Sequence, residues 1–406
     1  MDGLLFLAHR IPFPPNKGDK IRSFHLLRHL SARYEIHLGA FVDDPDDWQY
    51  RDALKPYCAS IKLLPLHSRR ARLASLTGLL SGEALTLPYY RNRELAVWAK
   101  EMADAGRVTR GLAYSSAMAQ FMPAGLVRRV IDMVDVDSDK WTQYASTQRW
   151  PLSWVYAREG RKLAEWEARV AEDFDATLLV SRDEAALLQR HAPQARHKIG
   201  AFENGVDAEY FSPARDYPDP YPPGAQGIVF TGAMDYWPNI DAVSWFAERI
   251  FPAVRDAVPA AQFTIVGSRP TEAVGELARQ PGVVVTGGVP DVRPWLAHAV
   301  CAVAPLRIAR GVQNKVLEAM AMARPVIASP QAAEGIRAEA GRDFILAQGE
   351  AEFARAVVAQ LQTTSSAAPA RDCVLANYDW ARNLAAIDPL FEQAAALPPL
   401  LETCPA

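Results

Sequence analysis

The chain has 406 residues, of which half are hydrophobic and 22% are charged, as in ordinary soluble globular proteins. This length exceeds a single compact core and predicts two domains. The formal net charge of −3 argues against a dedicated nucleic-acid binder. The four cysteines form no C-x-x-C pair, which argues against a zinc site or a disulfide framework. No apolar run approaches the roughly 18–20 residues of a membrane span, so we expect a cytoplasmic protein that is able to work at the inner face of a membrane.

The first half of the chain alternates short apolar runs with longer stretches of helical periodicity. The expected strands are 4–8, 36–42, 61–64, 112–115, 129–134 and 176–180, and the expected helices include 21–31, 95–105 and 154–173. This regular alternation predicts a doubly wound parallel sheet.

The charge of this first half is uneven. Residues Pro65 to Val130 contain ten Lys or Arg and four Asp or Glu. Such a basic stretch suits an anionic membrane surface or an acidic acceptor. An ordinary set of solvated helices explains the same composition equally well, so both interpretations stay open at this point.

A segment rich in Pro, Gly, Asp and Tyr, Ser212 to Gly227, is the best candidate for a linker. Alternation then restarts, with expected strands at 227–231, 262–266, 283–286, 300–305 and 326–328, and expected helices at 240–258, 271–279, 292–299, 313–323, 350–362 and 378–395. We therefore expect an α/β protein with two Rossmann-like, doubly wound domains facing a central cleft. The first domain comprises residues 1–210 with a C-terminal helix, 376–406, packed back on it, and the second comprises residues 211–375.

The most informative segment, Pro305 to Ala328, is expected to form a loop, a helix and a strand. Gly311 lets a ligand approach the backbone at the helix start, where free N–H groups favour anions. Lys315 adds a cation, and Glu318 lies on the same helical face, about 5–6 Å away. This arrangement suits a nucleotide ribose-diphosphate, and an ordinary surface Lys–Glu contact has the same spacing.

A loop in the first domain is expected to face the same kind of ligand. Gly18 opens a helix after the first strand, so the N–H groups there are available to an anion. Lys17, Lys20 and Arg22 add positive charge. A plain proline-rich turn with solvated lysines is the alternative interpretation.

Four aspartates crowd the end of the strand 129–134, between Asp132 and Asp139. Carboxylates packed in this way are functional or cap the following helix. Asp137, Ser138 and Asp139 are candidates for the cap. Asp135 is the carboxylate that we expect to face the cleft.

Several cofactor and catalytic motifs are missing from the sequence. There is no G-x-G-x-x-G after either first strand, which disfavours a nicotinamide or flavin dinucleotide, and there is no P-loop. Neither a G-x-S-x-G elbow nor an H-E-x-x-H motif occurs. The eight histidines are scattered; His25 and His29 have i,i+4 spacing but no carboxylate nearby in the sequence, so a metal site is not indicated.

Five parts of the chain are informative in combination: Pro14–Leu30, Ile131–Trp141, Glu203–Asp207 with Tyr210–Pro213, Val229–Asp235 with Pro238–Asp241, and Pro305–Pro325. Together they resemble the retaining, family-4 glycosyltransferases of the GT-B fold. The chain looks most like the sugar transferases associated with exosortase (PEP-CTERM) exopolysaccharide systems. The resemblance covers nearly the whole chain.

The resemblance implies transfer of a sugar, with retention, from a nucleotide-diphospho-sugar to a glycan or lipid-linked acceptor in exopolysaccharide or cell-envelope polysaccharide synthesis. It implies no metal, because protein cations and helix dipoles stabilise the departing diphosphate. Glu318 is expected at the ribose hydroxyls and Asp135 at the transferred sugar. The residues expected to bind the donor are Gly18, Lys20, Gly232, Arg307, Gly311, Val312, Gln313, Asn314, Lys315 and Glu318, and those expected at the chemistry are Asp135, Lys315 and Glu318.

The sequence departs from the family pattern near the donor's sugar and phosphates. Arg310 stands where the family often has a glutamate, and Ala233 and the region of Asn239 stand where an arginine and a lysine are common. We therefore hypothesise that Lys315 and Arg307, together with Arg310, supply the phosphate-binding charge.

Two other functions are compatible with this sequence. A nucleotide-sugar epimerase of the same fold would bind the same donor without an acceptor. A catalytically silent protein that binds a nucleotide sugar or a lipid carrier would also explain the missing glutamate.

Overall fold

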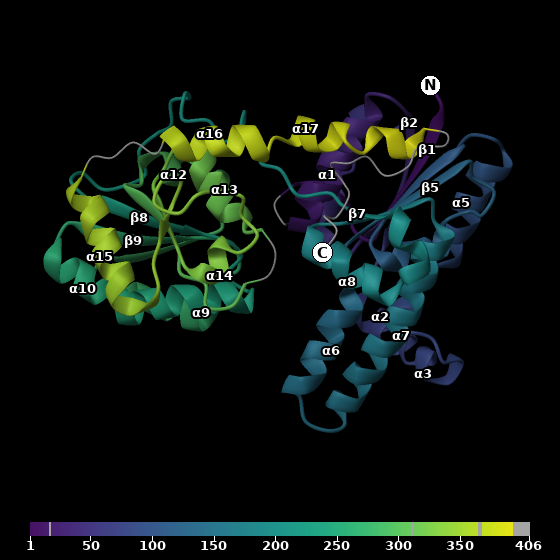
Figure 1. Ribbon diagram of the computed structural model, residues 1–406, viewed down its shortest axis with the longest axis horizontal. Helices are drawn as coiled ribbons and strands as arrows, with labels where there is room; N and C mark the ends of the chain where they lie inside the picture. Colours follow the sequence, from purple (N-terminus) through teal and green to yellow (C-terminus); the bar gives the residue numbers. More distant parts are fainter. Residues whose placement is uncertain (16–17, 310–311, 364–367, 393–406) are drawn as a thin grey trace. The chain divides into compact units, whose positions relative to one another are not determined.

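The structure, a computed structural model, describes residues 1–15, 18–309, 312–363 and 368–392. The chain forms two compact units (Figure 1). Unit 1 comprises Met1–Glu203 and Ala381–Ala406, and unit 2 comprises Asn204–Trp380. The proline-rich segment 212–227 therefore lies inside unit 2 and is not the linker that its composition predicted. None of the described helices is both long and apolar enough to cross a bilayer.

Unit 1 is built on a seven-stranded parallel sheet with the order β3-β2-β1-β4-β5-β6-β7. Its strands are β1 (Gly3–Ala8), β2 (Glu35–Val42), β3 (Ser60–Pro65), β4 (Arg110–Tyr114), β5 (Arg128–Val134), β6 (Ala176–Leu179) and β7 (Ile199–Ala201). Strand β1 is an unbroken apolar run that is buried at every position, as a parallel strand covered on both faces requires. The six strands predicted for this half are present, and β7 was not predicted.

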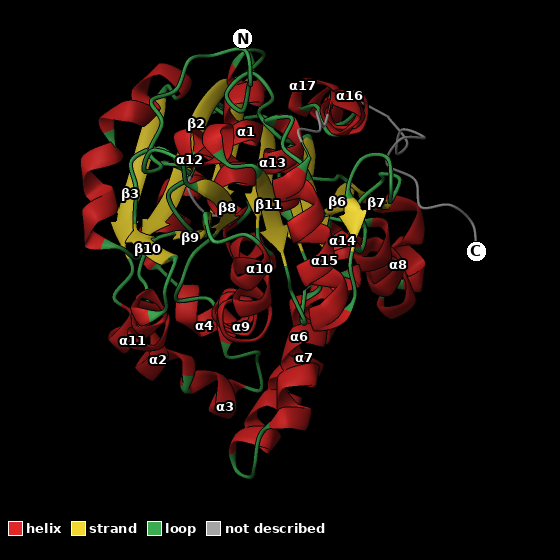
Figure 2. Cartoon of the chain, turned by 90° about the vertical axis from the view of Figure 1, so that its left-hand side faces the viewer, coloured by secondary structure: helices red, strands yellow, loops and turns green. Residues whose placement is uncertain are grey.

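Helices cover both faces of this sheet (Figures 1 and 2). They are α1 (Gly18–Ser31), α2 (Ser68–Ser75), α3 (Thr77–Ser81), α4 (Thr86–Tyr90), α5 (Arg93–Asp104), α6 (Asp137–Thr147), α7 (Leu152–Asp173) and α8 (Arg182–His191). Helices α6 and α7 form a hairpin that extends beyond the sheet. The two helices approach closely because Gly160 has no side chain: a Cβ there would lie 2.5 Å from Thr142 Oγ1.

The predicted cap of α6 is wrong. The helix begins at Asp137 after Val136, which has no side-chain oxygen to cap it. Instead, the buried Glu167 of α7 accepts hydrogen bonds from the Ser138 N–H, at 3.2 Å, and from the Ser138 hydroxyl. A carboxylate from the neighbouring helix thus satisfies the free N–H that Asp137, Ser138 or Asp139 was expected to satisfy.

Unit 2 is built on a six-stranded parallel sheet with the order β10-β9-β8-β11-β12-β13. Its strands are β8 (Gln226–Thr231), β9 (Ala261–Val266), β10 (Val283–Gly287), β11 (Cys301–Ala304), β12 (Val326–Ala328) and β13 (Ile345–Leu346). Its helices are α9 (Trp237–Trp245), the π-helical η5 (Phe246–Ile250), α10 (Phe251–Ala257), α11 (Glu272–Glu276), α12 (Arg293–His298), α13 (Asn314–Ala321), α14 (Pro330–Ala333), α15 (Gly349–Gln362) and α16 (Ala368–Asn377). Figure 1 shows the sheet between α12 and α13 on one side and α9 and α10 on the other.

The single terminal helix predicted over 378–395 is wrong. The chain instead forms α17 (Trp380–Ala385) and a 3-10 turn, η7 (Asp388–Phe391), and the residues after 392 lie outside the described chain. Two contacts with distant residues coincide with the interruptions of the predicted helix. The Tyr378 carbonyl accepts a hydrogen bond from the Val206 N–H at 2.8 Å, and the Asp388 carboxylate pairs with His29, at 2.7 Å, and with Arg33.

Candidate active site

Two loops of unit 2 leave the carboxyl ends of the neighbouring parallel strands β8 and β11. The first loop begins at Gly232 and leads into α9, and the second leads from β11 into α13. The sheet order reverses between these two strands, since β8 is followed by β9 on one side and flanked by β11 on the other. Open α/β sheets bind ligands at such a point.

A hydrogen bond between Lys315 of α13 and Asn239 of α9 connects the two helices that these loops lead into. The Lys315 ammonium donates a hydrogen bond to the Asn239 side-chain oxygen and lies 4.2 Å from the centre of the Phe230 ring. The Asn239 amide in turn donates to the Ala233 carbonyl at 2.9 Å. A Cβ on Gly232 would lie 2.7 Å from the Asn239 amide nitrogen, so this contact requires a glycine. The lysine is therefore held at the strand ends by contacts that leave its charge unneutralised.

Glu318 lies one turn after Lys315 on α13 and is half-buried. Within the described part of the chain its carboxylate has no hydrogen-bond or ion-pair partner. Burial raises the pKa of Glu318 to about 7, against the opposing charge of Lys315. Burial likewise lowers the pKa of Lys315 to about 7, against the opposing charge of Glu318. Two titratable groups kept half-buried, neither of them in an ion pair with a described residue, are typical of a ligand site.

Some of the remaining residues predicted to bind the donor lie outside the described residues, and others lie at the start of α13. Gly311 lies outside the described residues, as does Arg310. Val312, Gln313 and Asn314 lead into α13, and the buried side-chain oxygen of Asn314 has no hydrogen-bond partner among the described residues. 

Arg307 lies on the same loop and is half-exposed. Its guanidinium pairs with the Asp241 carboxylate on α9 through two nitrogens, one of them at 2.9 Å, and its centre lies 5.6 Å from the Trp245 ring. The charge of Arg307 is therefore largely offset by Asp241. Lys315 is the stronger candidate for the phosphate-binding cation.

Unit 1 contains a cavity of about 600 Å³ at the carboxyl ends of β1, β4 and β5. Its lining includes His9, Asp19, Ser115, Val134, Asp135, Lys140, Trp141 and Tyr156. The cavity again lies where the strand order reverses, between β1 and β4. Asp135, the carboxylate chosen from the sequence, lines this cavity.

The backbone at the cavity edge is strained. Val134, at the end of β5, has a φ of 69°, and Ser115, after β4, has a φ of 83°. A positive φ is unfavourable for a β-branched residue and is maintained at functional sites by surrounding contacts. One such contact is the hydrogen bond from the Val134 N–H to the Asp132 carboxylate, at 3.1 Å. The turn places Asp135 at the cavity, 2.7 Å from the Lys140 ammonium.

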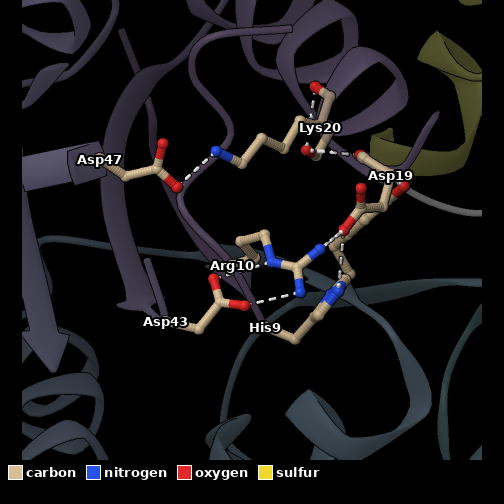
Figure 3. A network of polar contacts seen from close by, with 8 residues as sticks. His9, Arg10, Asp19, Lys20, Asp43 and Asp47 are labelled. Atoms are coloured by element: carbon tan, nitrogen blue, oxygen red, sulfur yellow. Dashed lines mark hydrogen bonds and ion pairs between the residues drawn. The ribbon is translucent and has the colours of Figure 1, made fainter. Parts of the chain in front are cut away.

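A network of charged residues stands beside this cavity (Figure 3). Arg10 forms a two-nitrogen contact with Asp43, at 2.9 and 2.7 Å, and pairs with Asp19 at 2.5 Å. Asp19 also lies 3.5 Å from His9. Burial opposes ionisation of Asp19, but the His9 contact and the Arg10 charge hold its pKa well below the usual range. His9 lines the cavity and stacks on Tyr114 at 5.7 Å.

Two cations predicted to face the diphosphate have structural roles instead. Lys20 is buried in an ion pair with Asp47 at 2.6 Å, so its charge is already neutralised (Figure 3). Arg22 is fully buried, pairs with Asp132 at 2.7 Å and lies 4.3 Å from the Phe202 ring. Gly18 is the first residue of α1, which begins before the helix start expected at residue 21. Lys17 lies outside the described residues.

Asn239, His9 and Lys140 were not selected from the sequence, although each contacts a candidate residue. Asn239 appeared only as the replacement for an expected lysine, and the hydrogen bond to Lys315 shows why an amide fits there. His9 directly follows the first buried strand, and this position is the one sequence signal that would have selected it.

Part of the chain matches a family model, and nearly the whole chain shares its fold with solved structures. Residues 225–363, within unit 2, match the family model described as glycosyl transferases group 1. No curated protein matches the chain significantly. Sucrose-phosphate synthase from Thermosynechococcus elongatus has a TM-score of 0.67 at 17% identity, with 97% of this chain and 99% of that chain covered. The fold is GT-B.

Two further structures share this GT-B fold. Anabaena Alr3699/HepE, solved in complex with UDP, has a TM-score of 0.62 at 13% identity, with coverage of 95% of this chain and 98% of that one. WaaG, a glycosyltransferase involved in lipopolysaccharide biosynthesis, has a TM-score of 0.59 at 15% identity, with coverage of 95% and 94%. These identities show a common fold, and the segment that matches the family model includes Lys315 and Glu318.

Proposed function

We propose that the protein transfers a sugar from a nucleotide-diphospho-sugar to a glycan or lipid-linked acceptor, with retention of configuration. The observation that carries this proposal is the carboxylate of Glu318, half-buried and without a partner in the described chain, one turn from Lys315 at the strand ends of a glycosyltransferase domain. A carboxylate in this position accepts hydrogen bonds from ribose hydroxyls, and the ammonium beside it binds a diphosphate.

The residues of unit 2 also suit the chemistry of the leaving group. Negative charge develops on the diphosphate as the bond to the sugar breaks, and fixed positive charge there lowers the barrier. Lys315 and the N–H groups at the start of α13 supply such charge, so we propose that the reaction needs no metal ion. In unit 1, Asp135 and Lys140 line the cavity and are the groups that we assign to the transferred sugar and its acceptor.

The known proteins of this fold support the donor class and the setting. HepE was solved with UDP and also with UDP and glucose, and WaaG acts in lipopolysaccharide biosynthesis. The motifs shared with exosortase-associated sugar transferases favour a role in exopolysaccharide or cell-envelope polysaccharide synthesis. Retention is proposed from the same motifs.

A thermal-shift panel of UDP, GDP, ADP, TDP and NAD tests the donor site. A nucleotide at 100 times its Kd stabilises a protein by about 2.7 kcal/mol. We expect one nucleoside diphosphate to stabilise the wild type and the control variant Glu272→Gln, whose side chain is exposed on α11, but not Glu318→Gln. Equal stabilisation of all three proteins, or of none, would contradict the proposed site. With the donor identified, the anomeric configuration of the glycoside product tests retention.

A further inference from the structure

Large apolar side chains are exposed at one end of unit 1. On α2 and α3 these are Leu73, Leu76, Leu79 and Leu80, of which Leu80 is 93% exposed. Around the turn of the α6–α7 hairpin they are Tyr144, Trp150, Leu152 and Trp154, of which Trp150 is 81% exposed. Figures 1 and 2 both show α3 beside α7. We refer to these eight residues as the apolar tip.

The two parts of the apolar tip are fixed to each other. The Arg158 guanidinium of α7 donates hydrogen bonds to the Gly78 carbonyl at 2.7 Å and to the Glu83 carbonyl at 3.0 Å. The Glu159 carboxylate accepts hydrogen bonds from the N–H groups of Leu85 and Thr86, which start α4. The helices are therefore held in place while their leucines and tryptophans stay in solvent. A contiguous exposed apolar surface of this kind marks a site that binds a protein or a membrane.

The charges around the apolar tip select an anionic partner. Residues 68–81 contain Arg69, Arg70 and Arg72 and no acidic residue, and Arg149 stands at the hairpin turn. None of these four arginines forms an ion pair with a described residue. The basic region predicted from the sequence also included residues 91–100, where Arg91 pairs with Glu83 and Lys100 with Asp104. The apolar tip thus carries a group of four arginines that have no ion-pair partner among the described residues.

The elements of the apolar tip also form walls of the cavity in unit 1. Arg72 and Ser75 of α2, Trp141 of α6, and Val155 and Tyr156 of α7 line it. The lining also includes Asp19 of α1 and Asp135, which follows β5. The helices that carry the tip therefore line the cavity with the aromatic side chains of Trp141 and Tyr156 and with the charged ones of Arg72, Lys140 and Glu159. A ligand with a polar head and an apolar tail finds partners for both parts in this lining.

We propose that the apolar tip rests on an anionic lipid bilayer and that the cavity takes the head of a lipid acceptor from that bilayer. Leucine and tryptophan beside arginine are the residues that bind the membrane interface, where the apolar side chains enter the acyl boundary and the cations face anionic headgroups. The bilayer contact stands independently of catalysis. The assignment of the lipid as acceptor rests on the proposed glycosyl transfer.

Co-sedimentation with phosphatidylcholine vesicles that contain phosphatidylglycerol tests the bilayer contact. We expect the full-length protein to bind at low salt, to bind neutral vesicles far less, and to dissociate as salt is added. The variants Leu76→Ser/Leu80→Ser, Trp150→Ser/Trp154→Ser and Arg69→Gln/Arg70→Gln should each lower binding at least about tenfold. Val97→Ser, which changes an exposed apolar residue on α5, is the matched control and should bind as the wild type does.

Two results would overturn the proposal: a wild type that does not sediment with anionic vesicles at low salt, or tip variants that sediment as well as Val97→Ser. Circular dichroism of each variant separates loss of binding from loss of folding. A blue shift of tryptophan fluorescence with vesicles, lost in Trp150→Ser/Trp154→Ser, would confirm which residues enter the bilayer.

The same proteins distinguish failure of this inference from failure of the proposed function. If the tip variants bind nucleotide and also bind vesicles as well as the wild type does, the proposed bilayer contact is refuted and the proposed donor site is not. If the wild type binds vesicles but no nucleotide, the proposed donor site is refuted and the bilayer contact is not. For the cavity, Trp141→Ala should lower transfer to a lipid-linked acceptor at least about tenfold while vesicle binding stays unchanged; equal transfer would refute the lipid-acceptor assignment.

Discussion

The two units differ in whether the charged residues near the carboxyl ends of their strands form ion pairs. In unit 1, Arg22 and Lys20 are buried against Asp132 and Asp47, so that most of their charge is neutralised within the fold. In unit 2, Lys315 is held by the neutral Asn239, and Glu318 has no partner within the described chain. All four residues lie in the first turns of a helix that follows a strand of the sheet. The partners of each charge, and not its position, separate structural residues from candidate ligand-binding ones.

The largest expected effect follows from removing Arg22. Arg22→Met leaves the Asp132 carboxylate buried without its partner, and breaking a buried pair in this way costs about 3–5 kcal/mol of unfolding free energy. Chemical denaturation measures the loss. Arg69→Met, on an exposed arginine, should change little, and Arg22→Met/Asp132→Asn should recover part of the stability. A variant Arg22→Met as stable as the wild type would show that this pair is not structural.

Lys315→Met tests the opposite claim for unit 2. The substitution removes the cation next to the proposed diphosphate, and we expect kcat/KM for the donor to fall about 100-fold, or about 2.7 kcal/mol. The melting temperature should change little, because burial already disfavours the charged lysine. Steady-state kinetics measures the effect, with Arg355→Met on the exposed face of α15 as the control. Unchanged donor kinetics would exclude Lys315 from the site.

Gly232→Ala tests the position of the Lys315 cation, because it keeps the charge and displaces the groups around it. The new methyl group would lie 2.7 Å from the Asn239 amide and 3.2 Å from the Lys315 ammonium, so both must move. We expect about a tenfold weaker donor affinity, the effect of a misplaced rather than a missing cation. Gly275→Ala on α11 adds a methyl group with no neighbour within 4 Å and should bind the donor normally. Calorimetric titration of both variants measures the difference.

The smallest effect concerns the carboxyl group that caps α6. Burial raises the pKa of Glu167 to about 8, against the hydrogen bonds from Ser138. The protonated form is therefore favoured in the fold, and its stabilising contribution, complete below about pH 4.5, is lost as the pH rises through about 8. Glu167→Gln should remove this dependence and be slightly more stable than the wild type above pH 8. Thermal melts across this pH range measure it; parallel curves for both proteins would refute it.

Much of the fold could be predicted from the sequence because buried parallel strands are continuous apolar runs. Every strand expected in the first half is present, and helix 154–173 was correct to within two residues. The terminal helix failed for a tertiary reason, since the chain breaks where Tyr378 and Asp388 bind distant groups. No local pattern encodes such contacts.

The candidate site was only partly predictable for the same reason. Lys315 and Glu318 are one turn apart, so their proximity follows from helix geometry. Lys20 and Arg22 have neighbours supplied by Asp47 and Asp132, which are far along the chain. A sequence shows that a charge is present, but its partner depends on which strands become neighbours in the sheet.

The pH dependence of nucleotide binding tests the central claim most directly. Lys315 and Glu318 both titrate near pH 7, and a bound ribose-diphosphate favours the charged form of each. Calorimetric titration of the nucleoside diphosphate chosen by the thermal-shift panel should give an affinity that is highest near pH 7. It should fall below that pH as Glu318 is protonated and above it as Lys315 loses its proton. Glu318→Gln should abolish the acidic limb and Lys315→Met the alkaline limb. A pH-independent affinity, or identical profiles for the wild type and both variants, would contradict a donor site built on this pair.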